Sequence, residues 1–224
     1  MSLELPSCIL FDLDGTLVDS LPGIELAVRN AFSMCGLPLL TDNLRDLIGP
    51  PIRTILSRAG NVTEGNALDA LERAFRHSYD EEGWRASSCY PEARLVLQTI
   101  QDRGHRAFVV SNKPRHISLL MIEREDILKH FEAVVTRDSR SPNYTSKGEM
   151  IETLLAERSI AHEECVMFGD TLEDATAAGA AGIKFIFMDH GYGRLPQISS
   201  IPIWYRLDNF SHLLSSMTKE TVVD

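Results

Sequence analysis

The 224-residue chain contains no uninterrupted apolar run of about 18 residues, the length an α-helix needs to cross a membrane. Its first six residues also lack a basic segment followed by an apolar one, so we expect no secretory signal. The four cysteines are scattered without the paired spacing that is typical of zinc sites. These absences predict a protein of a reduced, cytoplasmic compartment that neither spans nor binds membranes.

Basic residues are scarce as well, since 22 lysines and arginines face 32 acidic residues and the net charge is -10. This balance excludes general affinity for nucleic acid and for anionic membranes. It does not exclude a small anionic substrate, because a bound metal ion can outweigh the overall field locally. The seven histidines include no pair spaced i and i+4, so we do not expect them to bind a metal.

Short apolar segments alternate with amphipathic ones along most of the chain. The predicted strands are residues 7–13, 106–111, 133–136, 165–169 and 183–188, with a weaker sixth at 203–205. The predicted helices between the later strands are residues 92–103, 115–128, 147–157 and 172–180. This alternation predicts an α/β fold, in which βαβ units build a doubly wound, Rossmann-like parallel sheet.

Residues 19–87 interrupt the alternation. They show helical patterns at 24–32 and 67–79, and no convincing strand. We therefore predict an α/β core domain made of residues 1–18 and 88–224, with a helical cap domain inserted at 19–87. The hinges are expected near residues 19–22 and 87–91, and residues 218–224 are expected to form a frayed tail.

Polar residues that can carry chemistry follow several predicted strands. Each has an ordinary structural explanation when taken alone: a turn, a helix cap, a surface lysine, or a capping box between Thr171 and Asp174. Because the carboxyl ends of parallel strands share one edge, we expect these residues to converge. They are Asp12, Asp14, Ser111, Asn112, Lys147, Asp170 and Asp174.

Such a set predicts phosphoryl transfer through a phosphorylated aspartate. Asp12 is the candidate nucleophile, and Asp14 is the candidate acid and base. Lys147 and Ser111 are expected to hold the phosphoryl oxygens. The predicted Mg²⁺ ligands are the side chains of Asp12 and Asp170 and the backbone carbonyl of Asp14, with Asp174 beside them.

Further residues are candidates for binding the substrate. Backbone N–H groups near Gly15 and Asn112 are expected to donate to the phosphate, with Thr16 beside them. Arg45 and Arg53 of the predicted cap are read first as surface arginines. The alternative is that one of them grips an anionic group of the substrate remote from the reacting phosphate.

The segments 12–16 (Asp-x-Asp-Gly-Thr), 110–114 around Ser111, and 169–174 (Gly-Asp-x-x-x-Asp) resemble the haloacid dehalogenase (HAD) superfamily. The likeness is to its phosphatases with a helical cap, of the phosphoglycolate phosphatase type, and residues 48–52 and 191–193 share it. It implies a Mg²⁺-dependent hydrolase of a small phosphorylated metabolite. The third motif departs from the family pattern: its lysine, Lys147, opens a helix, and Arg137 and Arg140 are weaker substitutes.

Several alternatives stay open at this point. A sugar-phosphate mutase of the β-phosphoglucomutase type, a pyrophosphatase and a nucleotidase would share these motifs. A phospho-receiver module is disfavoured because the acidic pair stands on the first strand and a large cap follows, and a silent binding protein is disfavoured because no motif position is lost. Asp14 argues against a dehalogenase, and the lack of lysine between Asp19 and Trp84 argues against a Schiff-base phosphonate hydrolase.

Overall fold

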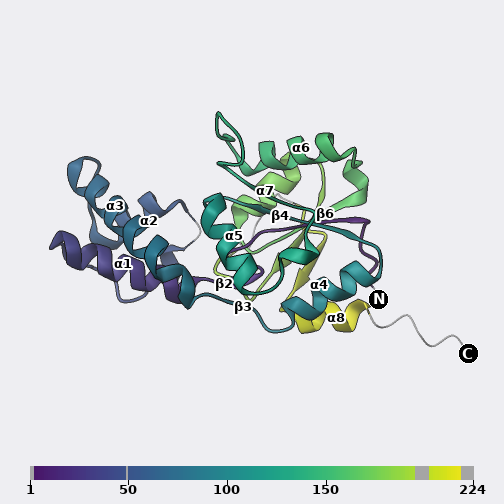
Figure 1. Cartoon of the computed structure of the whole chain (residues 1–224), viewed down its shortest axis with the longest axis horizontal. Helices are drawn as coiled ribbons and strands as arrows, with labels where there is room; N and C mark the ends of the chain where they lie inside the picture. Colours follow the sequence, from purple (N-terminus) through teal and green to yellow (C-terminus); the bar gives the residue numbers. More distant parts are fainter. Residues whose placement is uncertain (1–2, 49, 195–201, 218–224) are drawn as a thin grey trace, which may run out of the picture. The chain divides into compact units, whose positions relative to one another are not determined.

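The computed structural model describes residues 3–48, 50–194 and 202–217 (Figure 1). Gly49 of the family-like segment 48–52 and the predicted tail 218–224 lie outside these residues. The chain divides into two compact units, one formed by Met1–Val18 and Cys89–Asp224 and the other by Asp19–Ser88. Within the described part, no helix is long and apolar enough to cross a membrane.

The first unit is built on a six-stranded sheet in the order β5-β4-β1-β6-β7-β8. Every neighbouring pair in this sheet is parallel. The strands are β1 (Cys8–Phe11), β4 (Arg106–Ser111), β5 (Ala133–Thr136), β6 (Cys165–Gly169), β7 (Lys184–Met188) and β8 (Tyr205–Leu207). The predicted α/β fold with a doubly wound parallel sheet is therefore confirmed.

The direction of strand addition reverses at β1. The chain adds β4 and β5 on one side of β1 and then adds β6, β7 and β8 on the other. In Figure 1, α6 (Lys147–Arg158) and α7 (Leu172–Ala180) lie on one face of the sheet, and α4 (Ala93–Asp102) and α5 (Arg115–Arg124) lie on the other. Such a reversal leaves a crevice at the carboxyl ends of the strands, where ligands bind in open α/β sheets.

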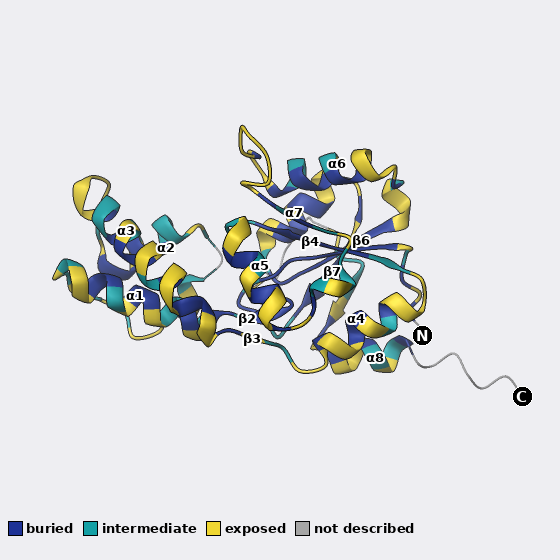
Figure 2. Ribbon diagram, viewed as in Figure 1, coloured by how far each residue is buried: buried dark blue, intermediate teal, exposed yellow. Residues whose placement is uncertain are grey.

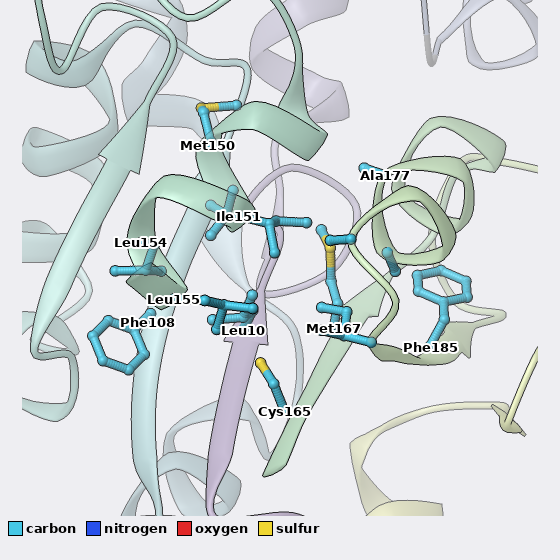
Figure 3. Close-up of a cluster of buried hydrophobic side chains, with 14 of the residues drawn as sticks. Leu10, Phe108, Met150, Ile151, Leu154, Leu155, Cys165, Met167, Ala177 and Phe185 are labelled. Atoms are coloured by element: carbon cyan, nitrogen blue, oxygen red, sulfur yellow. The ribbon is translucent and has the colours of Figure 1, made fainter. Parts of the chain in front are cut away.

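The strands of this sheet are largely buried (Figure 2), and most of their buried residues are apolar. On one face, Leu10, Phe108 and Met167 of three strands pack against α6 and α7, and Figure 3 shows this cluster. Strands that are covered on both faces read as continuous apolar segments, which is why the sequence predicted them well.

The structure moves some of the predicted boundaries. β1 ends at Phe11, two residues before the predicted end, because the chain then turns toward Gly15, whose φ is +79°. α5 ends at Arg124 because Asp126 takes a positive φ of 51°. β8 begins two residues later than expected, and α8 (Phe210–Met217), which the sequence analysis did not predict, packs against α4.

The second unit is helical and contains α1 (Leu21–Cys35), α2 (Ile52–Gly60) and α3 (Asn66–Glu81), with short 3₁₀ turns at Arg45–Leu47 and Gly83–Ala86. Close packing at its base requires a glycine, since a Cβ on Gly23 would lie 2.1 Å from the carbonyl oxygen of Gly83. Two short strands, β2 (Val18–Asp19) and β3 (Ser88–Cys89), pair where the chain enters and leaves this unit.

The core predicts a matched pair of stability effects. Leu154→Ala removes a side chain of α6 that is 2% exposed and is expected to cost about 2–5 kcal/mol of unfolding free energy. Leu95→Ala changes a leucine of α4 that is 56% exposed and should stay within about 0.5 kcal/mol of the parent. Urea unfolding measures both values, and equal losses in the two variants would contradict this description of the core.

Candidate active site

Three aspartates meet where β1 and β6 end. Asp12 follows β1, Asp170 follows β6, and Asp174 lies in the first turn of α7. One carboxylate oxygen from each lies within 4.8 Å of the others, and all three residues are buried. The two strands are paired neighbours, so their register places Asp12 and Asp170 side by side although 158 positions separate them in the printed numbering.

Lys147 supplies positive charge to this cluster. Its Nζ lies 2.8 Å from Oδ1 of Asp12 and 2.5 Å from Oδ1 of Asp174. It is the first residue of α6, whose N-cap Ser146 accepts a hydrogen bond from the backbone N–H of Glu149. Burial alone would lower the pKa of Lys147, but Asp12 and Asp174 outweigh it and raise that pKa, so the side chain remains an ammonium ion.

Asp174 has a second task. Its Oδ2 accepts hydrogen bonds from the backbone N–H of Thr171 at 3.0 Å and from the Thr171 hydroxyl at 2.5 Å. The Thr171 hydroxyl in turn accepts from the N–H of Asp174, which completes the capping box that the spacing predicted. The carboxylate that orients Lys147 is therefore fixed by the start of α7.

Asp170 is held by a different set of contacts. Its Oδ2 accepts backbone N–H groups of Tyr192 at 2.7 Å and Gly193 at 3.3 Å, and its Oδ1 accepts the Thr16 hydroxyl at 3.3 Å. A Cβ on Gly191 would lie 2.2 Å from the Cβ of Asp170, so only glycine fits there. The segment 191–193, which shares the family likeness, and the fully buried Thr16 thus both contact a candidate metal ligand.

Gly15 also packs against Asp170. A Cβ on it would lie 2.4 Å from Oδ2 of Asp170, and its φ of +79° favours glycine independently. Its backbone N–H donates to the carbonyl oxygen of Val18 at 2.9 Å. This hydrogen bond fixes the turn after Asp14, and the predicted role of that N–H group in binding substrate would require the bond to break.

The charge of the cluster fits a divalent cation. Burial is the main cause that raises the pKa of both Asp12 and Asp170, and the neighbouring carboxylate of Asp174 raises both further. One ammonium ion, that of Lys147, faces three buried carboxyl groups. Oxygen donors of this kind are what Mg²⁺ prefers, and its charge would favour their ionised forms.

The end of β4 contributes the remaining polar groups. Ser111 is buried, and its Oγ accepts the backbone N–H of Lys113 at 3.4 Å. The amide of Asn112 donates to Oε1 of Glu173 at 2.7 Å. Lys113, which the sequence analysis did not select, places its Nζ 2.9 Å and 3.1 Å from the two carboxylate oxygens of Asp14.

The arginines considered for the third motif are engaged elsewhere. Arg137 donates to the carbonyl oxygens of Tyr144 at 3.4 Å and Thr145 at 3.3 Å. Arg140 pairs with Glu149, and its guanidinium lies 4.0 Å from the centre of the Tyr144 ring. Both therefore stabilise their own loop, whereas Lys147 lies among the aspartates.

The two candidate arginines of the helical unit differ in their surroundings. The guanidinium of Arg53 forms ion pairs with Asp69 at 2.8 Å and Glu72 at 3.0 Å, so it ties α2 to α3. Arg45 begins the 3₁₀ turn that precedes α2. The contacts of Arg53 thus fit the first interpretation of that residue, a surface arginine with a structural role.

The raised carboxyl pKa values predict how pH acts on metal binding. Burial raises the pKa of Asp12 to about 8 and that of Asp170 to about 7, so a cation must displace protons below these values. Mg²⁺ affinity should rise from about pH 6 to about pH 8, by up to about tenfold per pH unit for each proton released. Isothermal titration calorimetry measures it.

Stability of the metal-free protein should show the opposite trend. A carboxyl group whose pKa is raised by folding contributes stability that is fully present below its ordinary pKa of 3.8, and this contribution is lost as the pH rises from there through about 7 to 8. Thermal unfolding in EDTA at several pH values tests this fall in stability. Asp126→Asn, which changes an exposed acid, is the control and should show the same fall as the parent. A Mg²⁺ affinity that is independent of pH would contradict both expectations.

The close packing of Gly191 against Asp170 predicts that Gly191→Ala weakens Mg²⁺ binding, because the added methyl group displaces the Asp170 carboxylate. We expect a loss of about tenfold or more, the range seen when groups that orient metal ligands are removed. Gly148→Ala is the control, since its new Cβ meets nothing closer than 3.7 Å. Calorimetric titration with Mg²⁺ gives the result without an activity assay. Equal affinities in the two variants would contradict the role of Gly191 in positioning Asp170 for Mg²⁺.

Comparisons with known proteins show what this chain is similar to. Phosphoglycolate phosphatase from Rhodobacter capsulatus is 30% identical over 92% of this chain and 94% of its own length. Tyrosine-protein kinase PtkA from Mycobacterium tuberculosis (strain ATCC 25618 / H37Rv) is 31% identical over 85% of this chain. The chain spans 65% of the length of PtkA and of the other curated relatives that share its name.

Solved structures share the fold. The haloacid dehalogenase-like protein SP0104 from Streptococcus pneumoniae superposes with a TM-score of 0.84 at 23% identity, covering 94% of this chain and 97% of its own. A predicted phosphoglycolate phosphatase from Haemophilus somnus superposes with a TM-score of 0.81 at 25% identity, covering 93% and 96%. The family profile of haloacid dehalogenase-like hydrolases matches residues 9–188, and the chain belongs to this family.

Proposed function

We propose that the protein is a Mg²⁺-dependent phosphatase that hydrolyses a small phosphomonoester through a phosphorylated Asp12. The observation that carries the proposal is the buried cluster of three aspartates and Lys147 where β1 and β6 end, with Asp14 close by in sequence. Relatives that are named phosphoglycolate phosphatase and 5'-nucleotidase support a phosphomonoester as the substrate. The free cysteines are compatible with a reduced compartment such as the cytoplasm.

In the proposed reaction, a carboxylate oxygen of Asp12 attacks phosphorus, and the bond from phosphorus to the leaving oxygen breaks. Asp14 gives its proton to that oxygen. It then takes a proton from a water molecule that attacks the phosphorylated Asp12, so the products are the alcohol and inorganic phosphate. Asp12, Asp170 and the carbonyl of Asp14 would hold Mg²⁺, which offsets the negative charge of phosphate and carboxylate.

The remaining groups have roles that follow from their positions. The ammonium of Lys147 is proposed to balance charge on the phosphoryl oxygens as it already does for Asp12. The hydroxyl of Ser111, which lies at the end of the strand next to β1, is proposed to donate to one of these oxygens. Arg45 and Arg53 are the residues of the helical unit proposed to contact a remote anion of the substrate, and Arg53 would have to leave two ion pairs to do so.

Replacing the nucleophile gives the direct test. Asp12→Asn should abolish turnover of p-nitrophenyl phosphate with Mg²⁺, a loss of at least about 10³-fold, because an amide does not attack phosphorus. The experiment repeats with phosphoglycolate, a nucleoside 5'-monophosphate and pyrophosphate as substrates. Asp126→Asn is the matched control, since this exposed acid pairs only locally with Lys129 in the described contacts. Equal turnover by the Asp12 and Asp126 variants would refute the nucleophile.

The same assay separates the alternatives. Isomerised sugar phosphate formed faster than free phosphate would indicate a mutase. Because relatives named tyrosine-protein kinase match over most of the chain, one arm supplies ATP with a tyrosine-containing peptide. Transfer of phosphate to that peptide in place of release to water would replace the proposal. A phosphorylated Asp12 that persists without turnover would favour a receiver.

A further inference from the structure

A second lysine of the site has no role in the reaction described so far. Lys113 follows Ser111 and Asn112 after β4, and its Nζ lies 2.9 Å and 3.1 Å from the two oxygens of Asp14. Its side chain is only 7% exposed, and that of Asp14 is 25% exposed. A lysine is rarely buried to this degree without a carboxylate partner, so the pair is a built feature of the site.

The two lysines serve different acids. Lys147 bridges Asp12, the proposed nucleophile, and Asp174. Lys113 grips both oxygens of Asp14, the residue that is proposed to protonate the leaving oxygen. A contact to both oxygens restrains rotation of the carboxylate, while the exposed part of Asp14 leaves an approach for a proton acceptor.

The backbones on both sides of this ion pair are fixed independently. Asp14 forms a β-bridge with Val18. The N–H of Lys113 donates to Oγ of Ser111 at 3.4 Å, and the hydroxyl of Ser118 donates to the carbonyl oxygen of Pro114 at 3.0 Å. With both backbones held, rotation of the Asp14 side chain is the motion that Lys113 is placed to restrict.

We propose that Lys113 is a positioning residue that aims the Asp14 carboxyl group at the leaving oxygen. This inference rests on the proposed function and deepens it, because it names a class of substrate. When Asp14 gives its proton to the leaving oxygen it becomes a carboxylate, and the Lys113 ammonium stabilises that form until water returns a proton. The arrangement therefore suits phosphomonoesters of ordinary alcohols, whose alkoxides depart poorly without a proton.

Leaving-group dependence tests the proposal. p-Nitrophenolate departs readily without a proton, whereas the alkoxide of an alkyl phosphomonoester such as phosphoglycolate does not. In the first turnover, before phosphorylated Asp12 is hydrolysed, Lys113→Met should slow release of the alcohol from the alkyl substrate by about 10²-fold, the scale of one lost proton transfer, and release of p-nitrophenolate by less than about tenfold. Lys113→Arg, which keeps the charge and can grip both oxygens, should restore most of the loss.

Asp14→Asn provides a second measurement that does not depend on one variant. If Lys113 acts through Asp14, the double variant should lose no more alkyl activity than Asp14→Asn alone. Lys113→Gln covers the case in which the methionine variant does not fold. Lys129→Met, at a lysine that is 59% exposed, is the control and should match the parent on both substrates.

Each outcome has one meaning. A loss of similar size in the first-turnover rates of the aryl and alkyl substrates, failure of Lys113→Arg to restore the alkyl rate, or additive losses in the double variant would overturn the positioning role. A parent protein that hydrolyses no phosphomonoester would overturn the proposed function, whatever the variants do. Selective loss on alkyl substrates, restored by arginine, supports both.

Discussion

The burial of three carboxyl groups in one place is the constraint on which the rest of this structure depends. Asp12, Asp170 and Asp174 lie in the interior, where an unpaired charge is costly. Lys147 offsets part of that charge, and its own burial is possible only because two of these acids surround it. Without a cation, burial first and the neighbouring carboxylates second raise the pKa values of Asp12 and Asp170.

Much of the surrounding backbone serves this cluster. The capping box of α7 fixes Asp174, two N–H groups of the segment 191–193 fix one oxygen of Asp170, and glycine at 15 and 191 makes room for that carboxylate. Because these contacts already fix the candidate ligands, a cation would find them preorganised and cost little further ordering. A rigid sheet edge thus supports groups that would repel one another elsewhere.

The sequence predicted the sheet well and the contacts of individual side chains less well. Apolar segments with no polar interruption identify strands buried on both faces, as in β1 and β6. The early end of α5 depended on the positive φ of Asp126, which the sequence pattern did not predict. The pattern also did not predict α8. Thr16 was read as a substrate residue, yet its hydroxyl contacts Asp170, a partner that lies 154 positions away.

Lys113 shows most clearly what the sequence could not predict. Its position after Ser111 was visible, but 99 positions separate it from Asp14, and no local pattern says which acid a lysine will meet. The sequence by itself determined the α/β fold with its parallel sheet and which polar residues follow the strands, because periodicity and strand ends are local properties. Only the tertiary structure decided which lysine pairs with which carboxylate, because that choice depends on strand order, burial and the paths of loops that are distant in sequence.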